Sequence, residues 1–270
     1  MNDLKRFLDE DVGSGDITTE LFVPDVQGNA EIVCEDDAVT AGIEEAVQIF
    51  KLLDVKMKPL VKDGTRVKKG TKIAEISGPV KGILTGERTA LNMMMRMSGI
   101  ATATNDIINL CKPANKKIII AGTRKTTPGF RKYEKKAIVL GGGSSHRYGL
   151  YDQILIKDNH IQAAGGVANA MELAKNAPPG IKVEIEVENI NDAAAAAEKG
   201  ADIIMIDNSS LEETKKMYDL IKSVNPKILV EVSGRITKEN ARTYAAAADI
   251  ISLGALTHSV VAIHYSLSLL

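Results

Sequence analysis

The sequence is short of cysteine and has no long apolar run. Cys34 and Cys111 are its two cysteines in 270 residues, too few for a disulfide framework or a four-cysteine zinc site. No stretch approaches the roughly 18 consecutive apolar residues of a membrane-spanning helix. The N-terminal segment carries acidic residues where a signal peptide needs an apolar core. These absences predict a soluble, cytoplasmic protein.

The chain also lacks a net charge of either sign. Its 34 Lys and Arg stand against 35 Asp and Glu, a formal net charge of -1, which argues against a nucleic-acid coat or a basic membrane binder. The charge is uneven, however. Residues 1–45 hold thirteen acidic and two basic residues, whereas residues 116–136 hold eight basic residues and one acidic residue. The basic segment fits a nucleic-acid patch, a pocket for an anionic small molecule or a solvated face.

The first hundred residues predict a small mixed unit. Apolar spacing indicates helices at 4–8 and 43–50, a strand at 29–35, glycine-punctuated β segments at 61–84 and a long helix at about 87–110 with a break near Ser98-Gly99.

From about residue 115, seven β-rich runs follow one another, most of them separated by helical stretches. They are KIIIAG (117–122), AIVLGG (137–142), QILIKD (153–158), KVEIEVE (182–188), DIIMID (202–207), KILVEVSG (227–234) and DIISLG (249–254). This pattern predicts a parallel sheet covered by helices. Because no GxGxxG follows the first run, a (β/α) barrel fits better than a dinucleotide-binding sheet. The terminal residues 259–270 read as a helix that packs back on the N-terminal unit.

Polar side chains gather where these runs end, which in such barrels is where the active site lies. They are Lys157, Glu186, Glu188 and Asp207, with Glu231 inside its run, Thr123, Arg124 and Lys125 after the first run, and His146 and Arg147 before QILIKD. Cations and carboxylates at one rim suit a polyanionic substrate handled with a divalent metal. Glycine-bearing loops at SGRIT (233–237) and SLGALTHS (252–259) favour phosphate binding.

At these residues the chain resembles the quinolinate phosphoribosyltransferases, over nearly its whole length. The motifs that carry the resemblance are GDIT (15–18), ERTALN (87–92), SGIAT (98–102), TRKTTPGFR (123–131), GGGSSHRYGLYDQILIKDNHI (141–161), EVE (186–188), IDN (206–208), EVSG (231–234) and ISLGALTHS (251–259). The block from Gly141 to Ile161 is the most specific of them.

The resemblance implies an α/β protein with an N-terminal α/β sandwich-like domain at 1–105 and a C-terminal seven-stranded (β/α) barrel at 106–258. It implies a homodimer with shared active sites, open to higher assembly, in which one subunit's N-terminal domain closes the partner's barrel. The implied reaction joins quinolinate to phosphoribosyl pyrophosphate with Mg²⁺. Its products are nicotinate mononucleotide, CO₂ and pyrophosphate, in the synthesis of NAD.

The resemblance also implies roles for individual residues. Lys125, Lys157, Glu186 and Asp207 would be catalytic. Arg88 would reach a substrate carboxylate across the dimer, and Arg124, His146 and Arg147 would bind the two quinolinate carboxylates. Lys125 and Lys157 would meet carboxylate and phosphate oxygens, and Glu186 and Asp207 would serve the ribose hydroxyls and the metal, directly or through water. Thr123 joins the substrate-binding set, while Ser233, Gly234, Gly254 and His258 would hold the 5′-phosphate.

Two positions depart from the family pattern. Ser145 stands where Asn is usual before the His-Arg pair, and Arg235 stands where the usual SGGI has its second glycine. Arg235 is included among the substrate-binding residues, although we expect its guanidinium to point outward, because the site already holds many cations.

Three alternative functions differ from this one in testable ways. A phosphoribosyltransferase of the molybdate-transport or nicotinate-using branch is disfavoured by the four cations Arg88, Arg124, His146 and Arg147. A lipoyl- or biotin-like carrier, suggested by residues 61–84, would leave the barrel unexplained. A nucleic-acid-binding protein is disfavoured because the basic run is interleaved with strand residues and not with exposed aromatics.

Overall fold

The computed structural model describes residues 3–270, which form two compact units. The first unit contains the residues up to Asn105, Lys132–Gly142 and Val260–Leu270, and the second contains Asp106–Arg131 and Gly143–Ser259. Residues 132–142, expected within the barrel, thus belong to the first unit. Across residues 3–270, no helix combines the length and the apolar character needed to cross a membrane.

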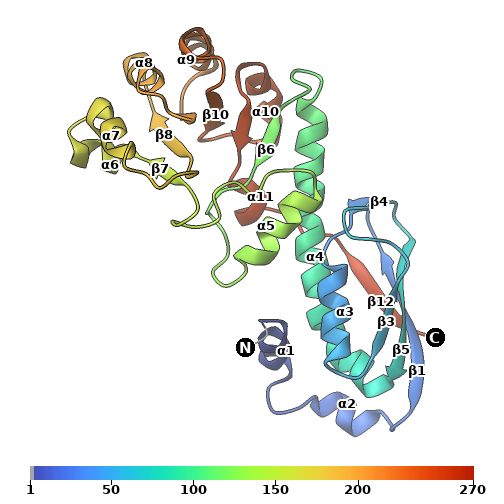
Figure 1. Cartoon of the computed structure of the whole chain (residues 1–270). Coiled ribbons are helices and arrows are strands. Elements are labelled where there is room, and N and C mark those ends of the chain that lie inside the picture. Colours follow the sequence, from blue (N-terminus) through green and yellow to red (C-terminus); the bar gives the residue numbers. More distant parts are fainter. Residues whose placement is uncertain (1–2) are drawn as a thin grey trace. The chain divides into compact units, whose positions relative to one another are not determined.

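The first unit is an antiparallel sheet with helices packed on it. Its elements are α1 (Asp3–Val12), α2 (Ile17–Phe22), β1 (Gln27–Cys34), β2 (Ala38–Val39), α3 (Ile43–Lys51), β3 (Lys56–Pro59), β4 (Arg66–Val67), β5 (Thr71–Pro79), most of α4 (Val80–Cys111), α5 (Arg131–Leu140) and β12 (Tyr265–Leu269). The sheet order is β12-β1-β5-β3, and β2 pairs separately with β4. Helices α3 and α4 lie on one face of the four-stranded sheet (Figure 1).

The end of the chain is a strand, so the predicted helix at 259–270 is wrong. Strand β12 pairs antiparallel with β1, with Tyr265 opposite Cys34 and Leu269 opposite Ala30. The sequence YSLSL alternates with period two, as a half-buried strand does. The open edge of β1 supplies backbone hydrogen-bond partners for this segment. Because β1 is far away in the sequence, the local pattern of residues 259–270 cannot reveal this pairing.

Two further local predictions are wrong in this unit. Helix α4 runs unbroken through Ser98 and Gly99. A Cβ on Gly99 would collide with the carbonyl oxygen of Val261, so this glycine allows a close approach of two backbones and does not end the helix. The run AIVLGG is not a strand, because its first four residues continue α5, in which Tyr133, Ala137 and Ile138 are buried at helical spacing.

The second unit is built on a six-stranded parallel sheet in the order β6-β11-β10-β9-β8-β7. Its strands are β6 (Ile119–Ala121), β7 (Ile154–Ile156), β8 (Val183–Val187), β9 (Ile203–Asp207), β10 (Leu229–Ser233) and β11 (Ile250–Ser252). Its helices are α6 (Asp158–Ala164), α7 (Val167–Ala174), α8 (Ile190–Glu198), α9 (Leu211–Val224), α10 (Lys238–Tyr244), the 3₁₀ turn Ala245–Ala247 and α11 (Ala255–His258).

The predicted class of this unit, a parallel sheet with helices between its strands, is confirmed, but the predicted number of seven strands is wrong. Six of the seven predicted runs are strands, and the seventh, AIVLGG, is the end of α5 followed by a turn. A single bridge from Ala121 to Ser144 extends the sheet beyond β6. Within residues 3–270, no hydrogen-bonded strand pairing connects this end to β7, so the ladder is open.

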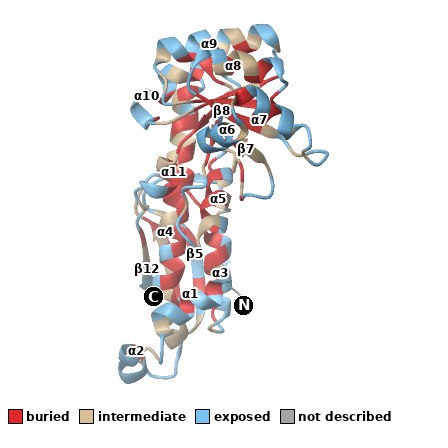
Figure 2. Ribbon diagram, turned by 90° about the vertical axis from the view of Figure 1, so that its left-hand side faces the viewer, coloured by how far each residue is buried: buried red, intermediate tan, exposed pale blue. Residues whose placement is uncertain are grey.

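In β8, β9 and β10 one face is apolar and packs on the helices, and the polar residues lie on the other face. Ile185, Ile204 and Val230 belong to one core cluster with Met171 of α7 and Met217 of α9, so these side chains point outward to the helices. Figure 2 shows this burial along the strands and the exposed outer sides of α8 and α9. Because side chains alternate along a strand, the residues between them point to the opposite, inner face.

Candidate active site

The inner face of the parallel sheet forms a cavity of about 240 Å³ at the carboxyl ends of the strands. Nine of the predicted site residues line it: Thr123, Arg124, Lys125, His146, Arg147, Lys157, Glu186, Asp207 and Ser233. They come from four strand ends and two loops. The strand register aligns Glu186 with Met205 and Met205 with Glu231, so these three inward residues lie side by side across the sheet.

The remaining predicted residues do not line this cavity. Gly254 lies beside it, because a Cβ there would come within 3.0 Å of Lys125 Cδ and of His258 Nε2. Gly234 has a φ of +77°, and a Cβ on it would lie 2.7 Å from the backbone nitrogen of Asn208, so only glycine fits. Arg235 is exposed and has a φ of +51°. Arg88, in the first unit, lines a separate cavity there with Asp11 and Asp16.

Cations and carboxylates are paired at the rim of the cavity. Lys157 Nζ donates to Glu186 Oε2 over 2.6 Å, and the carboxylate is the more buried partner. Burial raises the pKa of Asp207, and the negative charge of Glu186 raises it further, while Lys157 and Lys125 oppose this shift. A cation bound between these two carboxylates would reduce their mutual repulsion.

The guanidinium of Arg147 is among the few charged groups buried in this protein, with 8% of the residue exposed. Burial lowers the pKa of Arg147, and the neighbouring positive charge of Arg124 lowers it further. An arginine nevertheless stays charged in proteins. Two guanidinium groups held close together in a partly dry cavity therefore favour an anion that can bind both.

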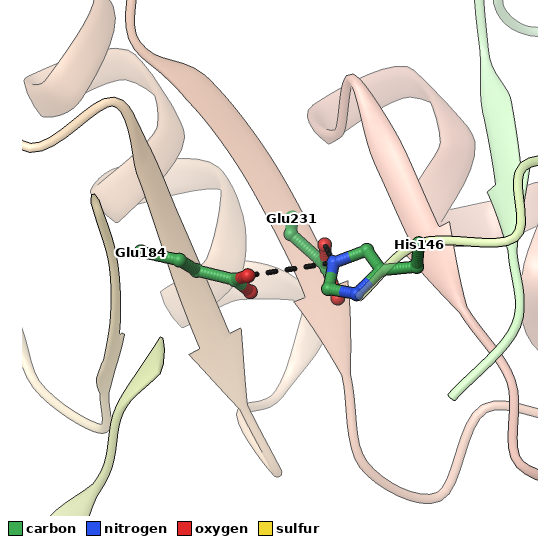
Figure 3. Close-up of side chains that lie close together, drawn as sticks. All are labelled: His146, Glu184 and Glu231. Carbon is green, nitrogen blue, oxygen red and sulfur yellow. Dashed lines mark hydrogen bonds and ion pairs between the residues drawn. The ribbon is translucent and has the colours of Figure 1, made fainter. Parts of the chain in front are cut away.

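Deeper in the cavity, His146 meets two buried glutamates. Its Nε2 lies 2.8 Å from Glu231 Oε2 and 3.4 Å from Glu184 Oε2, and both glutamate side chains have no exposed surface. Figure 3 shows the imidazole edge turned toward both carboxyl groups. Burial, with the charge of Glu231 next, raises the pKa of Glu184 to about 9. Gln153 Nε2 donates to Glu184 Oε2.

The sequence interpretation missed several residues of this site. Glu184, Gln153 and Ser252 were not singled out, and Glu231 was noted without a role. The alternation in VEIEV could have indicated Glu184, because it lies two residues before Glu186 and so points to the same face. No local signal marks Gln153 or Ser252. Ser252 lines the cavity, and its buried hydroxyl has no hydrogen-bond partner among residues 3–270.

The residues present fit a divalent cation in two places. Glu186 and Asp207 offer oxygen ligands at the rim, the donor type of Mg²⁺, which takes one or two carboxylates and completes its shell with water and phosphate oxygens. His146, Glu184 and Glu231 form a second group, whose ligand atoms lie within 4.8 Å of one another. The hydrogen bond from His146 to Glu231 already accounts for the second arrangement, whereas the rim pair gains from a cation.

This combination defines a class of protein: an α/β enzyme that handles a polyanionic substrate at the carboxyl edge of a parallel sheet. Comparison with known sequences identifies it further. The family model "Quinolinate phosphoribosyl transferase, C-terminal domain" matches residues 100–268, and the corresponding N-terminal domain model matches residues 16–98. The chain belongs to the quinolinate phosphoribosyltransferase family, which confirms the family predicted from the motifs.

Individual relatives are similar over nearly the whole chain. A probable nicotinate-nucleotide pyrophosphorylase [carboxylating] of Archaeoglobus fulgidus is 40% identical over 259 residues, which cover 95% of this chain and 98% of the relative. The human nicotinate-nucleotide pyrophosphorylase [carboxylating] is 38% identical over 242 residues, or 89% of this chain and 82% of the relative.

Solved structures agree with the sequence relatives. The nicotinate-nucleotide pyrophosphorylase of Francisella tularensis superposes with a TM-score of 0.92 at 37% identity, covering 99% of this chain and 94% of that one. Human nicotinic acid phosphoribosyltransferase has a TM-score of 0.62 at 12% identity, covering 91% of this chain and 71% of that one, a likeness of fold alone. The predicted mixed α/β fold, with an N-terminal antiparallel and a C-terminal parallel unit, is confirmed.

Proposed function

We propose that this protein transfers the phosphoribosyl group of phosphoribosyl pyrophosphate to quinolinate. The ring loses one carboxylate as CO₂, and the products are nicotinate mononucleotide and pyrophosphate, in the de novo synthesis of NAD. The observation that carries the proposal is the cavity in which Arg124, Lys125, His146, Arg147 and Lys157 converge. Family membership over both domains gives this cluster its substrate.

The cations match the charge of the two substrates. Quinolinate brings two carboxylates, and phosphoribosyl pyrophosphate brings a phosphate and a pyrophosphate. Burying an anion without a partner costs several kcal/mol or more, so a cavity for these ligands needs cations on its walls. In our assignment, Arg124, His146 and Arg147 bind the quinolinate carboxylates, and Lys125 and Lys157 bind carboxylate and phosphate oxygens. The planar arginine side chains suit carboxylates because each can bind two oxygens at once.

The two carboxylates at the rim suit the first chemical step. The bond from C1 of the ribose to pyrophosphate breaks, and positive charge develops on the ribose while the quinolinate nitrogen forms the new bond. Glu186 and Asp207 would stabilise that charge and bind the ribose hydroxyls. Mg²⁺, held by these two side chains directly or through water, would neutralise the pyrophosphate that leaves. The protein contributes positioning and electrostatic stabilisation, without a covalent intermediate.

The second step needs an electron sink, which the product of the first step supplies. Once the ring nitrogen is ribosylated it is cationic. The bond between C2 and its carboxylate can then break, because the electron pair left on C2 is stabilised by the adjacent positive nitrogen. A proton at C2 completes the product. The cavity assists by keeping the ring carboxylates between Arg124 and Arg147 while the bond breaks.

The phosphate-binding assignment follows the glycine loops. Ser233 lines the cavity, and Gly234 follows it on a loop where a side chain has no room. Gly254 and His258 lie next to Lys125 on the neighbouring loop. We assign Ser233, Gly234, Gly254 and His258 to the 5′-phosphate of the ribose, because exposed backbone N–H groups bind phosphate oxygens well. Thr123 would contact substrate from the loop after β6.

We further propose a homodimer in which each active site takes Arg88 from the partner subunit. Two observations support this. The Arg88 side chain is 58% exposed and lines a cavity of the first unit, which shares no lining residue with the cavity of the parallel sheet. Helix α2 exposes Ile17, Leu21 and Phe22 to 79%, 73% and 75%, an apolar surface of the kind that protein interfaces cover. The cytoplasmic location and further assembly of dimers stay predictions from the sequence.

One assay tests the function directly. Purified protein is incubated with quinolinate, phosphoribosyl pyrophosphate and Mg²⁺, and the release of CO₂ and pyrophosphate is measured. We expect equal amounts of both products and none when nicotinate replaces quinolinate as the acceptor. A folded sample that yields no product above background contradicts the assignment.

The shared site has its own test. Arg88→Ala and Lys157→Ala proteins should each be nearly inactive. Mixing and reassociating them should restore activity, since one of the two sites in each hybrid dimer carries both native residues. If hybrids form and no activity returns, the active site is built within one chain.

A further inference from the structure

The cluster of His146, Glu184 and Glu231 lies at the base of the proposed active site. Glu184 is on β8 and Glu231 is on β10, two strands that are separated by β9 in the sheet. Both point to the inner face, and their carboxyl groups reach the same ring nitrogen of His146 from two sides (Figure 3). His146 and Glu231 line the cavity, whereas Glu184 is fully buried behind them.

The hydrogen-bond partners define which way the imidazole faces. Glu231 Oε2 lies 2.8 Å from Nε2, a short distance for a bond between nitrogen and oxygen. Glu184 Oε2 accepts from Gln153, so it too is an acceptor facing that nitrogen. A ring nitrogen that faces acceptor oxygens is best satisfied when it carries the proton. The ring is thereby fixed with Nε2 toward the glutamates.

The backbone of His146 needs such a restraint. Its φ is +54°, in the left-handed region that residues other than glycine seldom occupy. The backbone N–H of His146 donates to Ser144 Oγ over 3.1 Å, and Ser144 itself is bridged to Ala121 of the sheet. Unusual backbone conformations persist where the surroundings hold them, and they are concentrated at functional sites.

We infer that Glu231 is a positioning residue for the reaction: it accepts the Nε2–H hydrogen bond of His146 and so sets the orientation in which this side chain meets quinolinate. The inference rests on the proposed function, because it concerns the acceptor that His146 binds. Glu231 acts through His146 and not on the substrate. Glu184, held by Gln153, closes the other side and keeps the ring from turning.

The inference is tested with two substitutions of similar size. Glu231→Gln keeps an acceptor oxygen, whereas Glu231→Leu removes it. We expect kcat/KM for quinolinate to fall at least about tenfold in Glu231→Leu and clearly less in Glu231→Gln. The affinity for phosphoribosyl pyrophosphate, measured alone by calorimetry, should stay the same in both. Glu172→Leu, which removes an exposed carboxylate paired with Lys175, is the matched control and should match wild type.

A double-mutant cycle separates positioning from a general structural role. In a His146→Gln background, adding Glu231→Leu should change kcat/KM by less than about twofold, because residues that act through one another are not additive. A loss as large as in the wild-type background would mean that Glu231 contacts substrate or supports the fold independently, and would overturn the inference.

Nuclear magnetic resonance gives a readout that does not depend on turnover. The chain has four histidines, so the Nε2–H signal of His146 can be assigned by its loss in His146→Gln. This signal should shift in Glu231→Gln and disappear through solvent exchange in Glu231→Leu. An unchanged signal in Glu231→Gln overturns the inference even if the leucine variant does not fold.

The outcomes also distinguish this inference from the proposed function. If wild-type protein does not turn over quinolinate, the proposed function fails, while the magnetic resonance test still decides the contact between Glu231 and His146. If wild type is active and the variants equal it, the inference alone fails. A stoichiometric transition metal in purified wild type, lost in Glu231→Leu, would assign the cluster to a cation and would likewise overturn the inference.

Discussion

Lys157 and Glu186 form an ion pair at the rim of the cavity, with Lys157 Nζ 2.6 Å from Glu186 Oε2. Lys157 directly follows β7 and Glu186 lies on β8, the neighbouring strand, so the parallel pairing of the two strands sets their distance. In our assignment, Lys157 binds substrate anions and Glu186 binds the ribose, so the pair links two different functions of the site. Its two members should therefore act as a unit.

We predict that Lys157→Met lowers kcat/KM for quinolinate by more than tenfold, about 1.4 kcal/mol. Glu186→Gln should have an effect of similar size. The double variant should lose less than the product of the two single losses, because each single change already breaks the pair. Steady-state kinetics measures all three. Lys216→Met, which breaks an exposed pair with Glu212 on α9, is the control and should leave kinetics unchanged.

Removal of Arg147 should separate the two substrates. A buried charged pair that loses one partner costs roughly 2–5 kcal/mol, so Arg147→Ala should reduce kcat/KM for quinolinate by at least about thirtyfold. Binding of phosphoribosyl pyrophosphate alone should change much less. Arg147→Lys should recover little, because lysine cannot bind two oxygens of a carboxylate at once. Equal losses for both ligands would instead assign Arg147 to phosphate binding or to folding. Arg242→Lys, a change at an exposed arginine of α10, is the control and should leave both measurements unchanged.

Arg235→Gly should leave the kinetics almost unchanged. The side chain is exposed and does not line the cavity. The substitution should preserve the free energy of unfolding or raise it by up to about 1 kcal/mol. A left-handed backbone costs arginine about 1–2 kcal/mol, and glycine removes this cost. Part of the gain is lost because glycine also makes the unfolded chain more flexible. Chemical denaturation measures the stability. A tenfold rise in the KM for phosphoribosyl pyrophosphate would contradict the outward orientation.

Asp16 should stabilise the first unit in a pH-dependent way. Its Oδ1 accepts from the backbone N–H of Thr19 over 3.0 Å, which caps helix α2, and its Oδ2 accepts from the Thr85 hydroxyl. Bonds from Thr19, first from its side chain and then from its backbone N–H, lower the pKa of Asp16. Asp16→Ala should therefore lower the free energy of unfolding by about 1 kcal/mol at pH 7. Asp16→Asn, which keeps a capping oxygen, should cost less.

The pH dependence follows from the direction of that shift. A carboxyl whose pKa is lower in the folded protein contributes its stability above the unfolded value of about 3.9 and loses it as the pH falls through the folded value. The difference in stability between wild type and Asp16→Ala should thus be constant near neutral pH and should shrink below about pH 4. Urea titrations at several pH values measure it, and a difference that grows on acidification would contradict the role of Asp16.

The sequence predicts the family, the two-unit α/β class and most of the cavity, because strand ends in a parallel sheet meet at one edge. Lys157, Glu186 and Asp207 could be found this way, each at the end of a strongly apolar run. The runs that are apolar throughout did not show which of their residues face the helices and which face the cavity; only an alternating run does so. KVEIEVE alternates, and its glutamates point inward while Ile185 and Val187 are buried against helices.

The errors arise where distant parts of the chain decide the local structure. Val139 and Leu140 look like strand residues, yet they extend a helix whose Glu134 pairs with Arg96 on α4. YSLSL becomes a strand because β1 offers an edge. Glu184 was missed for a similar reason: its role depends on His146, which comes from a loop 38 residues earlier in the sequence. Only the folded sheet brings the two together.

The pairing of β12 with β1 has a consequence for synthesis of the chain on the ribosome. Strand β1 lies inside the antiparallel sheet, between β5 and β12, but β12 follows the whole parallel sheet in the sequence. Every strand of the parallel sheet leaves the ribosome before Tyr265–Leu269 does. During that interval one edge of β1 has unsatisfied backbone groups that can pair with another nascent chain. A stop codon in place of Val260 would therefore leave a complete parallel sheet attached to an antiparallel sheet that lacks β12.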